Sequence, residues 1–193
     1  GSTTPLVSSI QQTGISFSYT YDNRGNIVSE TRNGATTTYA YDALGQLVRV
    51  NDPHENATWV YNYDRGGNIT SKVKYAFTTG DLGAAIETIP YAYGDANWKD
   101  KLTAYNGTTI TYDAIGNPLN DGTWTYTWSA GRQLTQMVKD GMTIQYRYDH
   151  NGLRIAKIVN GVETRYVLNG KRLTHLHRGN DWMHFFYDEQ GRP

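Results

Sequence analysis

Nine residues, Tyr19-Thr20-Tyr21-Asp22-Asn23-Arg24-Gly25-Asn26-Ile27, carry the pattern on which this chain is built. The pattern Tyr-x-Tyr-Asp-x-x-Gly-x-apolar returns at residues 39–47 and 61–69, and shorter copies stand at 110–117, 146–152 and 185–191. Self-similarity of this kind is the signature of a repeat architecture. We therefore interpret the chain as a series of repeats.

Each part of the pattern has a physical role. Tyr19 and Tyr21 share one face of a strand, because side chains alternate with period two. Asp followed three residues later by Gly is typical of a type I turn with a G1 bulge, since Asp bonds its own turn and Gly accepts the left-handed conformation. The predicted turn residues are Asp22, Gly25, Asp42, Gly45, Asp64, Gly67, Asp113, Gly116, Asp149, Gly152, Asp188 and Gly191.

A second kind of turn lies between the first kind. Asn33-Gly34, Asn106-Gly107, Asp121-Gly122, Asp140-Gly141, Asn160-Gly161 and Asn169-Gly170 are the dipeptides favoured in two-residue type I′ hairpins. One repeat is then a strand, a Tyr-Asp turn, a second strand and an Asn-Gly turn, about 20 residues in all. The sequence predicts an all-β fold of antiparallel hairpin repeats, with about 14 to 16 short strands and almost no helix.

These residues resemble the Rhs/YD-repeat family, which includes bacterial polymorphic toxins, wall-associated proteins, insecticidal toxin complex C components and teneurins. The stretch 95–102 running into 110–118 is similar to a recurrent passage of Gram-positive Rhs surface proteins. The resemblance implies a curved, spiralling sheet that forms part of a hollow shell, which in toxin members encloses a C-terminal effector. Many members carry a self-cleaving Rhs core after the last repeats, and this chain stops where such a core would begin.

We divide the chain into four parts. Residues 1–14 are a tag scar (Gly1-Ser2) and a Thr/Ser/Gln-rich lead-in, expected to be poorly ordered or an edge strand. Residues 15–72 hold the first three repeats. Residues 73–104 are an irregular insertion with a decayed repeat at 91–95 and a protruding loop or short helical turn at 78–86. Residues 105–193 continue the repeats toward the truncated core.

Composition excludes several functions. Eighteen basic and 18 acidic residues give a formal net charge of +0, so the charge gives no reason to expect nucleic acid as a partner. With 0 Cys, neither disulfides nor Cys-based metal sites can form. No apolar run long enough for membrane insertion exists. No cofactor is expected, and the resemblance places the parent protein at the cell surface or outside the cell.

The 16 Tyr and 5 Trp residues suit a single sheet with an aromatic face better than a two-layer sandwich. We expect each Tyr to bury its ring while its hydroxyl stays hydrated. Whether the tyrosines share one face remains open at this point. The Tyr-Asp turn places Tyr21 opposite Ile27, whereas the Asn33-Gly34 turn places Tyr39 opposite Val28. Either a bulge restores one face, or the aromatic residues alternate sides.

No catalytic arrangement stands out, because the chain has no Cys nucleophile, no Gly-x-Ser-x-Gly elbow, no Walker pattern and no His-Glu-x-x-His. If Gly179-Asn180 closes a hairpin, His175 lies opposite His184, and His177 opposite Trp182. These three histidines are a weak candidate for a metal cluster, and a solvated strand face is the favoured interpretation. Candidate carbohydrate-binding residues are Trp59, Trp98, Trp124, Tyr126, Trp128 and Trp182, for which cross-strand packing is the favoured alternative.

The favoured function is thus a non-catalytic structural segment of a large bacterial Rhs/YD-repeat protein, which encloses or presents a C-terminal effector. The alternative is a carbohydrate-binding or adhesion module. The expected partners are neighbouring repeats, the effector and glycans. A homodimer paired through edge strands near 15–21 and 183–187 is also expected, unless residues 3–14 fold back over the first edge.

Overall fold

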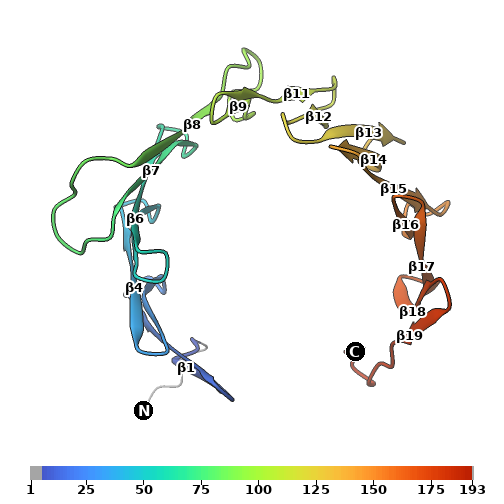
Figure 1. Cartoon of the computed structure of the whole chain (residues 1–193), viewed down its shortest axis with the longest axis horizontal. Coiled ribbons are helices and arrows are strands. Elements are labelled where there is room, and N and C mark those ends of the chain that lie inside the picture. Colours follow the sequence, from blue (N-terminus) through green and yellow to red (C-terminus); the bar gives the residue numbers. More distant parts are fainter. Residues whose placement is uncertain (1–5, 193) are drawn as a thin grey trace. The chain divides into compact units, whose positions relative to one another are not determined.

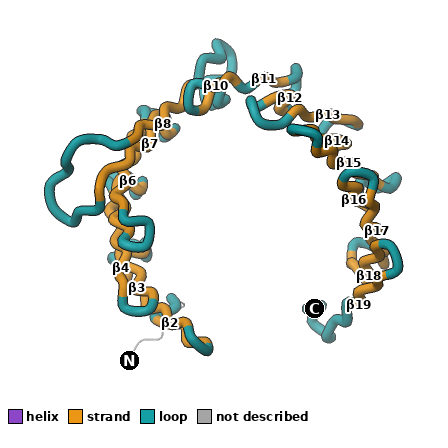
Figure 2. Tube along the Cα trace, viewed as in Figure 1, coloured by secondary structure: helices purple, strands orange, loops and turns teal. Residues whose placement is uncertain are grey.

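The structure is a computed structural model that describes residues 6–192. It falls into two compact units, residues 1–107 and residues 108–193. Figures 1 and 2 show strands joined by turns and loops, and residues 6–192 contain 19 strands and no helix. No helix of the described chain could therefore cross a membrane. The all-β prediction is confirmed, and the strand count exceeds the predicted one in part because the chain from Thr108 to Tyr112 forms two short strands, one on each side of Ile110.

In the first unit the strands follow one another in chain order, and each is antiparallel to the next. They are β1 (Ser9–Gln12), β2 (Ile15–Tyr21), β3 (Ile27–Arg32), β4 (Ala35–Tyr41), β5 (Leu47–Asp52), β6 (Ala57–Tyr63), β7 (Ile69–Ala76), β8 (Glu87–Ala92) and β9 (Ala104–Tyr105). The lead-in forms an edge strand, since β1 pairs with β2. The edge predicted near Ile15–Tyr21 is therefore already covered, which is the alternative stated above. The proposed scar lies outside the described residues.

The second unit begins with β10 (Thr108–Thr109) and continues with a sheet in which chain order again equals spatial order. Its strands are β11 (Thr111–Tyr112), β12 (Pro118–Asn120), β13 (Thr125–Ser129), β14 (Gln133–Lys139), β15 (Met142–Tyr148), β16 (Arg154–Val159), β17 (Val162–Asn169), β18 (Arg172–Arg178) and β19 (Asp181–His184). Strand β19 is the edge of this sheet among the described residues.

The Tyr-Asp turns have the predicted geometry. In the first of them the amide of Gly25 donates to the carbonyl of Asp22 over 3.1 Å, and the amide of Asp22 donates to the carbonyl of Asn26 over 2.9 Å. Gly25 has φ 87°, the left-handed conformation required by a G1 bulge. The same pair of backbone bonds occurs at Asp42, Asp64, Asp113, Asp149 and Asp188. Local side-chain chemistry therefore fixes these turns.

The prediction of two-residue turns at the Asn-Gly and Asp-Gly pairs is confirmed at four positions and wrong at two. Positive φ at both turn residues marks type I′ geometry at 33–34, 106–107, 140–141 and 160–161. At Asn169 the register pairs Asn169 with Arg172, so the two-residue loop is Gly170-Lys171 instead. At Asp121 the register pairs Asn120 with Thr125, which makes a four-residue loop. Trp124 consequently does not oppose Leu119, as a two-residue turn would require.

A bulge in each return strand places the tyrosines of the repeat pattern on one face, whereas Tyr75, which pairs with Thr58, lies on the other. On β3 the partner changes from Tyr21↔Ile27 to Thr20↔Ser29, which leaves Val28 as the extra residue. Equivalent shifts follow Tyr41, Tyr63 and Tyr148. Each bulge offsets the one-residue change of register that the next Asn-Gly turn would otherwise introduce. The question left open by the sequence is thus settled: the tyrosines of the repeat pattern share one face.

The core is thin, as expected for sheets that each form one layer (Figure 1). The buried apolar residues are Ala57, Val73, Ala156 and Ile158, and Thr37, Thr58 and Asn117 are the buried polar ones among the described residues. With so little buried apolar area, the units depend on ladder hydrogen bonds and on specific side-chain contacts between hairpins.

The predicted protruding loop lies between β7 and β8, at residues 77–86, and contains no helical turn. Its first residues are fixed to the sheet by Arg49, whose guanidinium donates to the carbonyls of Thr78 and Gly80 over 2.9 and 2.8 Å. The hydroxyl of Thr58 also donates to the Thr78 carbonyl over 2.9 Å. The rest of the loop is exposed, including Ile86 at 64%.

Candidate functional site: aromatic clamps between hairpins

In most repeats the second tyrosine of the pattern joins two successive hairpins. The ladder between β3 and β4 ends at Ser29↔Thr38, so the carbonyl of Ile27 lies beyond its last pair. The hydroxyl of Tyr41, at the end of β4, donates to that carbonyl over 2.9 Å. An otherwise unpaired backbone acceptor is satisfied in this way. We call such a bond, from an aromatic side chain to a carbonyl at the start of an earlier strand, an aromatic clamp.

The clamp recurs along both units. Its tyrosine members are Tyr21 to Val7, Tyr41 to Ile27, Tyr63 to Leu47, Tyr93 to Ile69, Tyr148 to Leu134 and Tyr187 to Leu173, with oxygen–oxygen distances between 2.6 and 3.0 Å. The expectation that these hydroxyls stay hydrated is therefore wrong, because each donates a hydrogen bond to a backbone carbonyl that lies earlier in the chain. Tyr93 belongs to the repeat predicted as decayed, which keeps its clamp although Gly94 stands in place of Asp.

Sequence reasoning missed a further copy of the repeat at residues 126–134. Trp128 stands where the second tyrosine is expected, Ser129 replaces Asp, and Leu134 occupies the apolar position. The indole N–H of Trp128 donates to the carbonyl of Pro118 over 2.7 Å, which is a clamp made with nitrogen in place of oxygen. The spacing of Tyr126, Trp128 and Leu134, equal to that of Tyr19, Tyr21 and Ile27, was the signal available in the sequence.

The opposite ends of the hairpins are also joined. The side-chain oxygen of Asn33 accepts a hydrogen bond from the amide of Ser16 over 2.9 Å, and the amide of Asn33 donates to the Ser16 carbonyl over 3.1 Å. Asn160 makes the same two contacts with Thr143. Asn in these turns thus serves both the left-handed backbone and the contact with the preceding hairpin.

The pKa values of Asp22, Asp64 and Asp95 are lowered in the folded chain. Asn26 donates a side-chain and a backbone hydrogen bond to Asp22, and these bonds lower the pKa of that carboxyl group. Asn68 acts in the same way on Asp64. In the insertion, the ion pair with Lys101 and the amides of Trp98 and Asn97 lower the pKa of Asp95 to about 2. These carboxylates act as turn formers in the structure.

The six candidate carbohydrate-binding residues make different contacts within their own units. The Trp59 indole donates to Glu55 and lies under the Lys72 ammonium, 3.7 Å from the ring centroid. Tyr126 donates to Asp121 over 2.6 Å, and burial together with this bond raises its pKa to about 12. Trp124 lies beside Lys139, and Trp128 is a clamp. Trp98 and Trp182, by contrast, are 48% and 54% exposed.

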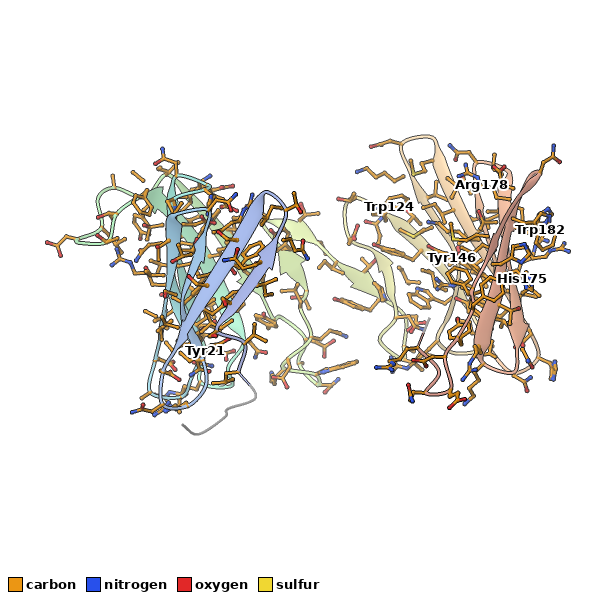
Figure 3. All side chains as sticks on the ribbon, turned by 90° about the horizontal axis from the view of Figure 1, so that it is seen from below. Tyr21, Trp124, Tyr146, His175, Arg178 and Trp182 are labelled. Carbon is orange, nitrogen blue, oxygen red and sulfur yellow. The ribbon has the colours of Figure 1, made fainter. Side chains whose placement is uncertain are left out.

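The predicted histidine pairing is present. His175 lies opposite His184 and His177 opposite Trp182 in the register of β18 and β19. The Trp182 ring stacks on His177 with centroids 4.2 Å apart, so the three imidazoles do not converge on one point. Within residues 6–192 no group of three or more His, Cys, Asp or Glu side chains is arranged to hold a metal ion. Figure 3 shows Trp182 and Tyr146 on opposite sides of the second sheet.

The chain resembles known proteins over most of its length. The family model described as "Teneurin YD-shell" matches residues 7–192. The chain belongs to the Rhs/YD-repeat family. The tRNA nuclease WapA of Bacillus subtilis (strain 168) is 37% identical over 141 residues, which are 71% of this chain and 6% of that protein. Human teneurin-1 is 29% identical over 188 residues, 89% of this chain and again 6% of the relative.

Solved YD-repeat shells share the fold. The crystal structure of TcdB2-TccC3-Cdc42 matches with a TM-score of 0.60 and 19% identity, covering 87% of this chain and 10% of that one. The Photorhabdus luminescens Tc holotoxin pore with mutated TccC3 matches with a TM-score of 0.54 and 20% identity, covering 86% of this chain and 10% of that one. The chain therefore has the YD-repeat fold and spans a small part of the length of the relatives it matches.

Proposed function

We propose that this chain is a non-catalytic wall segment of a larger Rhs/YD-repeat protein, secreted or displayed at the cell surface, in which the repeats enclose or present a C-terminal effector. The observation that carries this proposal is the aromatic clamp, which joins each hairpin to an earlier one and leaves the aromatic groups engaged with backbone. Aromatic residues whose donors join one hairpin to another are suited to a structural role in the wall of a shell.

The comparisons support the same proposal. WapA is named a tRNA nuclease, and the matched segment makes up 6% of it, which leaves ample chain for an effector elsewhere. The TcdB2-TccC3-Cdc42 structure is an assembly of several proteins, and a part of one of its chains shares the fold of this chain. The partners we propose are accordingly the neighbouring repeats and the effector of the parent protein.

A chimera tests the proposal. This chain replaces the matching segment of WapA, and resistance of the rest of the protein to an added protease is measured. We expect the chimera to resist, and the clamp-deficient variant Tyr41→Phe/Tyr63→Phe to be cleaved faster. The matched control is Tyr39→Phe/Tyr61→Phe, on the same strands and the same face. A chimera that is cleaved as readily as the unfolded protein, or tRNA cleavage by this chain alone, would contradict the proposal.

A second candidate function is carbohydrate binding through exposed indoles. It is favoured by Trp98 and Trp182, two residues that are about half exposed at 48% and 54%. Exposed aromatic rings offer an apolar face with little conformational entropy to lose on binding. Titration with cell-wall oligosaccharides, followed by Trp fluorescence in the wild type, Trp98→Ala and Trp182→Ala, tests this function. A spectrum unchanged by every glycan would exclude it.

A further inference from the structure

The outermost described strand of the second sheet carries one member of a histidine pair at its outer end. Strand β19 makes four register pairs with β18, and His175↔His184 is the pair farthest from the Gly179-Asn180 turn. The two imidazole rings meet edge to face, with centroids 4.6 Å apart. Immediately beyond this pair, the amide of Phe185 donates to the carbonyl of Thr174 over 2.9 Å, and the Tyr187 clamp follows.

The acidic side chains near this pair are engaged with arginines or lie on the other face. The face that bears His175 and His184 carries Val167, Arg165 and Glu163 on β17, according to the register. Glu163 is already paired with Arg147 and Arg165, over 3.1 and 3.3 Å. Asp181, on β19, pairs in register with Arg178 and so lies on the other face. On its own strand His175 meets the hydroxyl of Thr174, 2.9 Å from Nδ1.

Trp182 contacts the three histidines of this face, with ring centroids 6.0 Å from His175, 6.4 Å from His184 and 4.2 Å from His177. His177 stacks on Trp182 with an interplanar angle of 22° and centroids 4.2 Å apart. A protonated imidazole over an indole gains a cation–π interaction. His177 also faces Arg165 across the ladder. Trp182 thus lies closest to His177, near the turn, whereas His184 meets another imidazole at the outer end of β19.

We propose that the His175–His184 pair is an acid-sensitive latch, which holds the outer end of β19 at neutral pH and releases it when both rings are protonated. Histidine is the side chain that gains its charge between about pH 7 and 5. Like charges directly opposite on a sheet destabilise the pairing, and at this separation they increase local opening by at least about fivefold. The opening breaks the Phe185–Thr174 bond and frees Tyr187 from Leu173.

Hydrogen exchange of single amides, measured by NMR at pH 7.5 and 5.5 and corrected for intrinsic exchange rates, tests the latch. We expect the protection of the Phe185 amide to fall by at least about fivefold at pH 5.5. The amide of Arg178, near the turn, is expected to keep its protection. Equal protection of Phe185 at the two pH values would overturn the proposal.

Three variants identify the groups responsible. His184→Gln and His175→Gln each leave only one imidazole of the pair able to gain charge, and both are expected to abolish the acid effect on Phe185. Two separate variants keep the test valid if one of them fails to fold. His150→Gln, in the Asp149 turn, is the matched control and is expected to retain the effect. An acid effect that persists in both latch variants, or that disappears in the control, would show that another group is responsible.

Discussion

The indole N–H of Trp128 and the carbonyl oxygen of Pro118 lie 2.7 Å apart, in the place where a tyrosine hydroxyl meets a carbonyl in the other repeats. An indole and a phenol differ in shape, and both can put a hydrogen-bond donor at the far end of a flat apolar ring. The repeat thus requires a ring of sufficient length that ends in a donor.

Replacement of Trp128 by Phe removes this donor and leaves the Pro118 carbonyl unpaired. We expect Trp128→Phe to lower the free energy of unfolding by about 1–3 kcal/mol more than Trp124→Phe does. Trp124 lies on the same face, and its ring meets Lys139. Urea denaturation followed by circular dichroism measures both variants. Equal losses would mean that the Trp128 bond contributes nothing beyond packing.

Tyr63→Phe tests a tyrosine clamp in the first unit. Its hydroxyl donates to the Leu47 carbonyl over 2.7 Å, so its removal is expected to cost about 1–3 kcal/mol of stability. Tyr61→Phe is the matched control, two residues earlier on β6 and on the same face, and it is expected to cost less than half as much. The clamp is dispensable if the two denaturation midpoints agree.

Gly25→Ala isolates the backbone requirement of the Tyr-Asp turn. No atom lies within 4 Å of the position that a Cβ would take at Gly25, and its φ is 87°, so only the backbone opposes the change. We expect a loss of about 1–2 kcal/mol. Gly83→Ala, in the exposed loop with open space and without a positive φ, is the control and is expected to be close to neutral. Thermal unfolding of the two variants gives the comparison.

Acid should weaken the Tyr-Asp turns. The pKa values of Asp22 and Asp64 are lowered in the folded chain, chiefly by hydrogen bonds from Asn26 and Asn68. Their contribution to stability is therefore fully present above the ordinary pKa of about 4 and is lost as the pH falls through the lower folded value. Urea midpoints measured from pH 5.5 to 2.5 should fall, and the fall should be smaller in Asp64→Asn. An unchanged slope in that variant would argue against the assignment.

Association of two chains through β19 is the last prediction. Trp182 and Met183 are 54% and 58% exposed on this edge strand, and an uncovered edge is a template for another strand. Sedimentation velocity across a concentration series is expected to show a dimer that Met183→Lys weakens. The first sheet offers no such site at β2, which is covered by β1. A monomer at every concentration would exclude the dimer.

The sequence was informative where structure is local. Asp22 and Gly25 define their turn through contacts within five residues, and so the turn type could be predicted. The bulge at Val28 could not, because it results from two turns that impose conflicting registers on one strand. The side chain of Asp121 accepts hydrogen bonds from the amides of Thr123 and Trp124, and these bonds widen the loop beyond the predicted two residues.

The site was predicted less completely than the fold. The tyrosines were recognised, but their hydroxyl partners lie in another hairpin and depend on where a ladder ends, which the sequence pattern does not specify. The pairing of His175 with His184 was predicted, because it depends only on a two-residue loop at Gly179-Asn180.

In every clamp the donor residue comes later in the sequence than the acceptor residue. Tyr41 donates to Ile27, Tyr63 to Leu47 and Trp128 to Pro118. During synthesis the acceptor hairpin has therefore left the ribosome before its donor appears, and each new hairpin finds its docking partner already in place. Because chains are made from the N-terminus and such contacts span few residues, the wall can be built in the order of translation.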